Sequence, residues 1–166
     1  MELVERFDKK RIPLNKVVER YNPTKGEYEQ STHIWIMNSK GEFLMQKRSM
    51  QKKIHPGKWS VTGGAVDPGE RPIDCIYRES KEEIGIDLDL DKVELMLSIK
   101  RKSAFIDIYL DREDLNANDL KLQKEEVDKV EWLNRAQIKE LIDNGETANS
   151  IVKYFGLLCD LIDEEL

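Results

Sequence analysis

The chain has 166 residues, of which 39% are hydrophobic and 36% charged, and its formal net charge at pH 7 is −6. This length and composition predict a single domain over residues 1–166, and no stretch approaches the roughly 18 consecutive apolar residues that a membrane span requires. The N-terminal segment MELVERFDKKR has no apolar core of the kind a secretory signal needs, so we expect a cytoplasmic protein.

The charges are distributed unevenly along the chain. Residues 1–60 hold 13 Lys and Arg against 7 Asp and Glu, whereas the remaining residues hold 14 against 26. Residues 43–66 include no acidic side chain, and residues 67–83 include six. Two solvated charge runs would explain this pattern. The alternative is a polyanion held by the first segment and a hard cation held by the second.

The first half of the chain predicts a hairpin and then a short strand that ends on two glycines. Residues 31–38 are apolar and β-rich, and residues 42–48 continue as a second strand after a tight turn at 39–41. Residues 59–62 form the short strand, and Gly63-Gly64 at its end allow the backbone to approach another group closely.

A central helix is predicted over residues 70–84. Apolar residues recur there with the spacing of one helical face, acidic residues occupy the opposite face, and Gly85 supplies a C-terminal stop. A mixed sheet covered by helices on both faces, an α/β/α sandwich, is the fold that this order of elements indicates. The remaining predicted elements are strands over 93–101, 104–110 and 127–133 and helices over 135–143 and 147–164.

Glu79, Glu82 and Glu83 form the pattern most suggestive of chemistry. Positions i, i+3 and i+4 project from one face of a helix, so the three carboxylates are expected to lie close together and to repel one another. A solvent-exposed acidic face is one interpretation. The other is a bound hard cation, because clustered oxygen ligands select Mg²⁺, Mn²⁺ or Ca²⁺.

The residues that surround these carboxylates resemble the Nudix box. The segment from Gly64 to Ile86 reads GAVDPGERPIDCIYRESKEEIGI, and all eight positions that the motif fixes are matched. Ser80 is a departure, because the family usually has an aliphatic residue at this inward-packing position. The resemblance extends more loosely from about His33 to Leu133 and implies a Nudix-type α/β/α sandwich with a mixed β-sheet.

The resemblance also implies an activity and its metal. A member of this family would be a Mg²⁺-dependent hydrolase, with Mn²⁺ as an alternative ion, that cleaves the diphosphate bond of a nucleoside diphosphate linked to another moiety, or of a related small diphosphate. By position, the expected metal ligands are Glu79, Glu82, Glu83 and the Gly64 carbonyl. The same comparison implies that Arg78 and Glu70 pair with each other and orient the helix.

The motif alone does not identify the general base or the substrate contacts. Glu126, just before the strand predicted over 127–133, is one candidate base, and Glu82 or Glu83 is the alternative. Four basic residues flank the loop that should overhang the diphosphate, and we expect at least one of them to contact it: Arg48, Lys52, Lys53 and Lys58.

Two other functions compete with hydrolysis. The stretch from Arg48 to Trp59 is also similar to the lead-in of isopentenyl diphosphate isomerase, but Thr62, Gly63 and Gly64 stand where that enzyme carries its catalytic cysteine. A non-catalytic Nudix-fold module that binds a regulatory ligand would usually lack the box acids, which are present here. We expect a small-molecule diphosphate partner and, because the chain is acidic, no nucleic acid. Homodimer formation through the terminal segments stays open.

Overall fold

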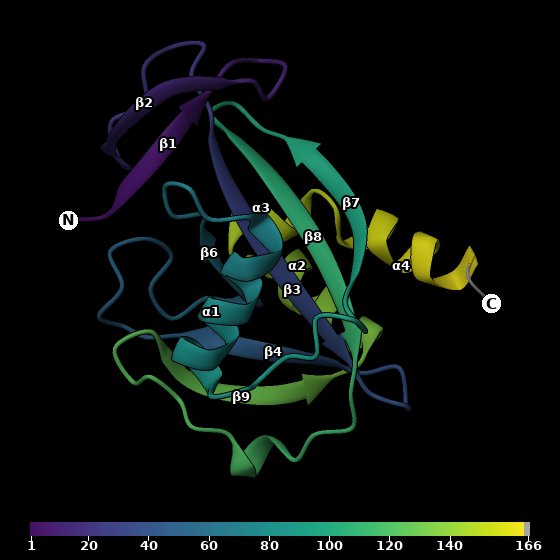
Figure 1. The fold of residues 1–166 in the computed structure, drawn as a ribbon. Coiled ribbons are helices and arrows are strands. Elements are labelled where there is room, and N and C mark those ends of the chain that lie inside the picture. The colour runs from purple at the N-terminus through teal and green to yellow at the C-terminus, as the bar shows by residue number, and fades with distance from the viewer. Residues whose placement is uncertain (165–166) are drawn as a thin grey trace.

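The strands form two separate sheets in the computed structural model, which describes residues 1–164. The larger is a 7-stranded mixed sheet in the order β5-β4-β3-β8-β7, with β6 paired to β3 and β9 paired to β4. The smaller consists of β1 and β2 and lies at one end of the molecule (Figure 1). The strands are β1 (Leu3–Phe7), β2 (Pro13–Glu19), β3 (Glu29–Met37), β4 (Phe43–Arg48), β5 (Trp59–Ser60), β6 (Thr62–Ala65), β7 (Glu94–Lys100), β8 (Ala104–Arg112) and β9 (Val127–Leu133).

Helices cover both faces of the larger sheet. Figure 1 shows α1 on one face and α2, α3 and α4 on the other. Because side chains alternate along a strand, β3 contributes to two cores: Ile34 and Ile36 pack with Ile76 of α1, and Trp35 stacks on Phe155 of α4. The predicted α/β/α sandwich is confirmed. The helices are α1 (Pro72–Ile84), α2 (Arg135–Asp143), α3 (Asn149–Val152) and α4 (Phe155–Glu164), with a 3₁₀ turn at Ala117–Asp119.

The predicted hairpin of β3 and β4 is a hairpin only at its turn. The two strands are joined at the pair Met37–Phe43, and β4 then pairs with β9 and β5. The edge of β3 that β4 leaves is taken by β6, which pairs antiparallel from Ser31–Ala65 to Ile34–Thr62. This divergence places the two glycines of β6 beside α1.

The helix α1 begins two residues later than predicted because Pro72 fits its first turn, where a missing N–H costs nothing. It ends at Gly85, whose φ of 72° is left-handed. The N–H groups of Gly85 and Ile86 donate to the carbonyls of Lys81 and Ser80, both at 3.2 Å. Glu70 therefore lies in the preceding loop, where its carboxylate accepts from the N–H of Asp67 at 2.9 Å.

The smaller sheet falls in residues 1–30, where no strand was predicted. β2 is exposed along nearly its whole length, so it has no alternation of apolar and polar residues to mark it as a strand. β1 buries Arg6, whose guanidinium pairs with Glu29 at 3.3 Å, in a position where the pattern of a strand calls for an apolar residue.

The helix predicted over 147–164 is two helices. Residues 146–148 bond to β5 instead, since Trp59 N–H donates to Glu146 and Ala148 N–H donates to Trp59, both at 2.9 Å. Tyr154, in the break between α3 and α4, is buried and its hydroxyl bonds to β3. No helix within residues 1–164 is long and apolar enough to cross a membrane.

Candidate active site

An open cleft of about 900 Å³ lies between α1, the loop of residues 49–58 and the smaller sheet. One part of its wall is acidic and comes from α1, and the part formed by the loop is basic. The cleft gathers residues from Glu2 to Ser150, which lie far apart in the sequence. The candidate site residues that line it are Arg48, Lys52, Lys53, Gly64, Glu79, Glu82, Glu83 and Glu126.

Glu83 is the most deeply buried of the three helix carboxylates, with 6% of its surface exposed. Gln46 on β4 donates from Nε2 to Glu83 Oε2 at 3.2 Å, and its own Oε1 accepts from the Thr62 hydroxyl at 2.9 Å. The Thr62 bond fixes the orientation of the Gln46 amide, so that its N–H faces Glu83. Burial, followed by the neighbouring charge of Glu79, raises the pKa of Glu83 well above its ordinary value.

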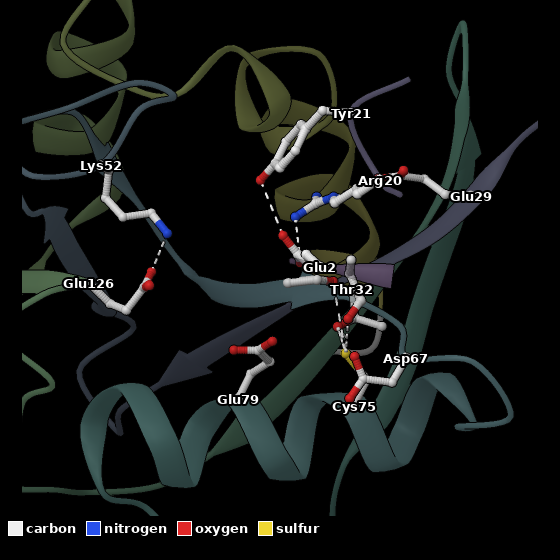
Figure 2. A network of polar contacts seen from close by, with 12 residues as sticks. Glu2, Arg20, Tyr21, Glu29, Thr32, Lys52, Asp67, Cys75, Glu79 and Glu126 are labelled. Carbon is white, nitrogen blue, oxygen red and sulfur yellow. Dashed lines mark hydrogen bonds and ion pairs between the residues drawn. The ribbon is translucent and has the colours of Figure 1, made fainter. Parts of the chain in front are cut away.

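Glu79 points from α1 into the cleft, as Figure 2 shows. Burial raises its pKa to about 7, although Arg78 Nη1 lies 3.0 Å from Glu79 Oε1 and opposes the shift. Two adjacent carboxylates with raised pKa values indicate negative charge that the protein does not fully compensate. Glu82 lies on the same helix but more than half of its side chain is exposed.

The carboxylates form hydrogen bonds to protein groups and do not converge on a common metal position. Within residues 1–164 no three His, Cys, Asp or Glu side chains form a ready-made metal cage. Glu79 is turned to Arg78, and Glu83 to Gln46, because these are the donors within reach. Glu79 and Glu83 nevertheless fit a hard divalent ion, since both offer buried, incompletely neutralised oxygens.

Gly64 and Gly63 have no room for a side chain. A Cβ at Gly64 would lie 2.3 Å from Glu79 Oε1, and one at Gly63 would lie 2.0 Å from the carbonyl oxygen of Thr32. Both distances are far inside van der Waals contact. Gly64 therefore allows the backbone of β6 to lie directly against the Glu79 carboxylate, and Gly63 allows it to lie against β3. Neither glycine leaves space for the reactive side chain of an isomerase.

Arg78 and Glu70 form a two-bond pair outside the cleft. Arg78 donates from Nε to Glu70 Oε1 at 2.8 Å and from Nη2 to Glu70 Oε2 at 3.0 Å, and Nη2 also donates to the Ala65 carbonyl at 3.2 Å. Burial works against ionisation of Glu70, but the bonds and charge of Arg78 together with the Asp67 N–H bond outweigh it, and the pKa of Glu70 is lowered. Arg78 thereby ties β6, the loop of residues 66–71 and Glu79 to one another.

The basic loop is also tied to the rest of the site. Lys52 Nζ pairs with the Glu126 carboxylate, and Figure 2 shows this ion pair beside Glu79. Arg48 Nε donates to the Ile54 carbonyl at 3.1 Å. Lys58 is placed differently from the expectation, because its Nζ bonds to the Gly145 carbonyl at 2.6 Å and it does not line the cleft.

The smaller sheet and the segment that joins it to β3 supply cleft residues that the sequence did not reveal. Arg20 donates to Glu2 at 3.0 Å and to Glu29 at 2.9 Å, and the Tyr21 hydroxyl donates to Glu2 at 3.2 Å (Figure 2). All four residues line the cleft. No motif or periodicity distinguishes them in the sequence, because they meet only through the tertiary fold.

His33 is a second residue that the sequence did not reveal. Trp35 Nε1–H donates to the Tyr154 hydroxyl oxygen at 2.9 Å, and the Tyr154 hydroxyl lies 2.6 Å from His33 Nδ1. With Trp35 as the donor to its oxygen, Tyr154 gives its own proton to Nδ1, so the proton of the imidazole is on Nε2. Burial, helped by the charge of Arg101, lowers the pKa of His33 to about 4 and keeps the ring neutral.

Comparisons with known proteins agree with this architecture. The family model for the NUDIX domain matches residues 27–155. A Listeria innocua protein, named an uncharacterized Nudix hydrolase (lin0387), is 32% identical over 133 residues, which cover 80% of this chain and 76% of the relative.

Two solved structures resemble the fold. DR0079 from Deinococcus radiodurans has a TM-score of 0.80 at 21% identity, and the match covers 96% of this chain and 99% of that one. A bifunctional NMN adenylyltransferase/ADP ribose pyrophosphatase from Francisella tularensis, complexed with AMP and a manganese ion, has a TM-score of 0.64 at 16% identity, over 84% of this chain and 43% of that one. From the family match, the relative and the geometry of the site, the chain belongs to the Nudix hydrolase family.

Proposed function

We propose that this single-domain enzyme hydrolyses the diphosphate bond of a nucleoside diphosphate linked to another moiety, or of a related small diphosphate, with Mg²⁺ as its cofactor. One observation carries the proposal. The buried carboxylate of Glu83, the half-buried carboxylate of Glu79 and three basic side chains line the same open cleft; the basic residues are Arg48, Lys52 and Lys53. A diphosphate with a divalent counter-ion complements both charges at once.

Glu79 and Glu83 would hold the ion, together with Glu82 and the Gly64 carbonyl oxygen. A bound divalent ion supplies charge neutralisation on the phosphate oxygens and a polarised water. Gln46 orients Glu83, and the Arg78–Glu70 pair holds α1 against β6 so that Glu79 stays in place. The manganese ion in the related Francisella tularensis structure supports a divalent ion of this type.

The basic side chains would bind the diphosphate. Arg48 and Lys53 have no carboxylate partner within residues 1–164, so their charge is available to phosphate oxygens. Lys52 is shared with Glu126. A phosphate that attracts Lys52 would free the Glu126 carboxylate, which we propose as the acceptor of the proton from the attacking water.

The first test is turnover of a panel of nucleotide sugars, dinucleotides, nucleoside triphosphates and non-nucleotide diphosphates, with Mg²⁺ and with EDTA. Glu83→Gln keeps the shape of the side chain but weakens it as a metal ligand, so we expect wild-type turnover to require Mg²⁺ and the variant to lose it by at least about 100-fold in kcat. Glu126→Gln should lower kcat by about 100-fold if Glu126 is the base.

Glu140→Gln is the matched control, because Glu140 is an exposed glutamate of α2 away from the cleft. It should leave kcat unchanged. Unaltered kcat in Glu83→Gln would contradict the metal assignment, and unaltered kcat in Glu126→Gln would return the role of base to Glu82 or Glu83. Binding of panel compounds without turnover would favour a ligand-binding module.

A further inference from the structure

Arg101 is a cationic side chain in the cleft that the proposed reaction does not use. It lies in the turn between β7 and β8, far from the Nudix box in the sequence, and is half-buried. Its backbone N–H donates to the Ala104 carbonyl at 2.7 Å, which fixes the turn. Its guanidinium lines the cleft and has no hydrogen bond or ion pair to any side chain of residues 1–164.

The acidic residues at this end of the cleft are already paired. Glu29 accepts from Arg6 and Arg20, and Glu2 accepts from Arg20 and Tyr21. Figure 2 shows the bonds of Arg20 and Tyr21 to Glu2, on the far side of the cleft from the Lys52–Glu126 pair. The charge of Arg101 therefore remains uncompensated, and a half-buried guanidinium without a partner favours an anion.

His33 adds a neutral donor to the same wall. Its Nδ1 is occupied by the Tyr154 hydroxyl, so the N–H is on Nε2, which has no partner within residues 1–164. Arg101 and His33 line the same cleft, and the charge of Arg101, followed by that of Arg48, helps burial to lower the pKa of His33. A guanidinium and an imidazole N–H on one wall provide donors from two different elements, which suits the several oxygens of a phosphate group.

The wall beside Arg101 carries several polar side chains among the apolar Ala104, Ile106 and Ala148. Ser31, Ser103, Asn149 and Ser150 line it together with Arg101. A long apolar moiety, such as a prenyl chain, would bury these hydroxyl and amide groups without partners, at a cost in free energy. A phosphorylated sugar would satisfy them.

We propose that Arg101 and His33 form a specificity subsite for a second phosphate group, carried by the substrate on the moiety beyond its diphosphate. The inference rests on the proposed hydrolase function and specifies its substrate class. The enzyme should prefer a diphosphate compound that bears an additional phosphomonoester over the same compound without it.

The test compares two pairs of compounds that differ by one phosphate: NADPH with NADH, and coenzyme A with dephospho-coenzyme A. Wild type should prefer the phosphorylated member of at least one pair. Arg101→Gln should raise KM for that member by about 10- to 100-fold, the effect of losing a charge-assisted contact. Its kcat should stay within about twofold of the wild-type value. KM and kcat for the unphosphorylated member should not change. Arg101→Lys should have a KM between those of wild type and Arg101→Gln.

Lys102→Gln is the matched control, because Lys102 is the next residue in the same turn, is exposed and does not line the cleft. It should have no effect on either pair. Three outcomes would each overturn the subsite. Arg101→Gln could raise KM equally for both members of a pair, or Arg101→Gln and Lys102→Gln could have equal effects. Wild type could also have the same KM and kcat with and without the extra phosphate in both pairs.

Failure of the hydrolase function would be recognised separately, as absence of metal-dependent turnover across the whole panel. In that case the same four compounds are compared by isothermal titration calorimetry with wild type and Arg101→Gln. A loss of affinity confined to the phosphorylated members supports the subsite, and equal affinities refute it.

Discussion

Glu79 has a pKa that makes the stability of the metal-free protein depend on pH. The pKa rises from an ordinary value of 4.5 to about 7 on folding, chiefly through burial. The folded state therefore binds more protons than the unfolded state between these values. The contribution of Glu79 to the free energy of unfolding is most favourable below about pH 4.5 and is lost as the pH rises through about 7.

We therefore expect the unfolding free energy of the metal-free protein to fall by on the order of 2 kcal/mol between pH 5 and pH 8. Urea unfolding in EDTA across this range measures the effect. Saturating Mg²⁺ should flatten the profile, because an ion that binds the folded state replaces the proton. Glu79→Gln should make the profile shallower without metal, and the part that comes from the raised pKa of Glu83 should remain. A profile in EDTA that is equally steep for wild type and Glu79→Gln would contradict this origin of the pH dependence.

Gly64 tests how closely the backbone of β6 must approach Glu79. Gly64→Ala places a methyl group where the Glu79 carboxylate lies, and the carboxylate can rotate away at little cost in stability. We expect kcat to fall by about 100-fold, as for other displacements of about 1 Å in a site, while the melting temperature changes by only a few degrees.

The control for Gly64→Ala is Gly156→Ala in α4, where a Cβ would meet no atom within 4 Å. That variant should keep full activity, and its stability should be equal or slightly higher, because alanine favours helix. Wild-type activity in Gly64→Ala would show that the carboxylate need not occupy its observed position.

At the scale of elements, Arg11 is one of the side chains that anchor the smaller sheet to the larger one, together with Arg6 and Arg20, which pair with Glu29. Arg11, in the turn between β1 and β2, donates from Nη1 to Asp107 Oδ1 of β8 at 2.8 Å and from Nη2 to Gln30 at 2.9 Å. Its guanidinium also lies 5.4 Å from the ring centroid of Phe105. Arg11→Ala would leave the buried Asp107 carboxylate without its cationic partner.

We expect Arg11→Ala to destabilise the smaller sheet by about 1–3 kcal/mol and to raise amide hydrogen exchange in β1 and β2 more than in β3. Mass spectrometry of the exchanged peptides measures this difference. Lys10→Ala is the control, because the Lys10 side chain is exposed and makes no bond in residues 1–164. Uniform faster exchange across the molecule would indicate global rather than local destabilisation.

The elements also differ in how far the sequence predicts them. The α1 carboxylates and their Arg78–Glu70 support could be located from the sequence because they occupy fixed spacings within one short motif. The strands β3, β4, β7, β8 and β9 were predicted to within two residues at each end. The single strand predicted over 59–62 is instead β5 and β6, because Gly63 and Gly64 pair with β3 rather than end a strand. The smaller sheet escaped prediction because Arg6 replaces an apolar residue and β2 is exposed. The cleft residues His33, Arg20 and Arg101 converge only through long-range packing, which periodicity does not record.

At the scale of the molecule, the cleft is assembled from segments at both ends of the sequence. Glu2 and Tyr21 contribute one part of the wall, α1 another, and Asn149 and Ser150 a third. Tyr154, which follows Asn149 and Ser150 in the chain, bonds to His33 in the middle of the sheet. The carboxylates of α1 thus come from a local motif, whereas the surroundings that would select a substrate come from the whole chain.

The distant origin of these walls has a consequence for synthesis on the ribosome. The strands and α1 leave the exit tunnel before Tyr154, and until then His33 and Trp35 lack the hydroxyl that orders them. A nascent chain would therefore carry its acidic helix before its specificity pocket exists. The completed pocket would appear only when α3 and α4 have emerged and packed against the sheet.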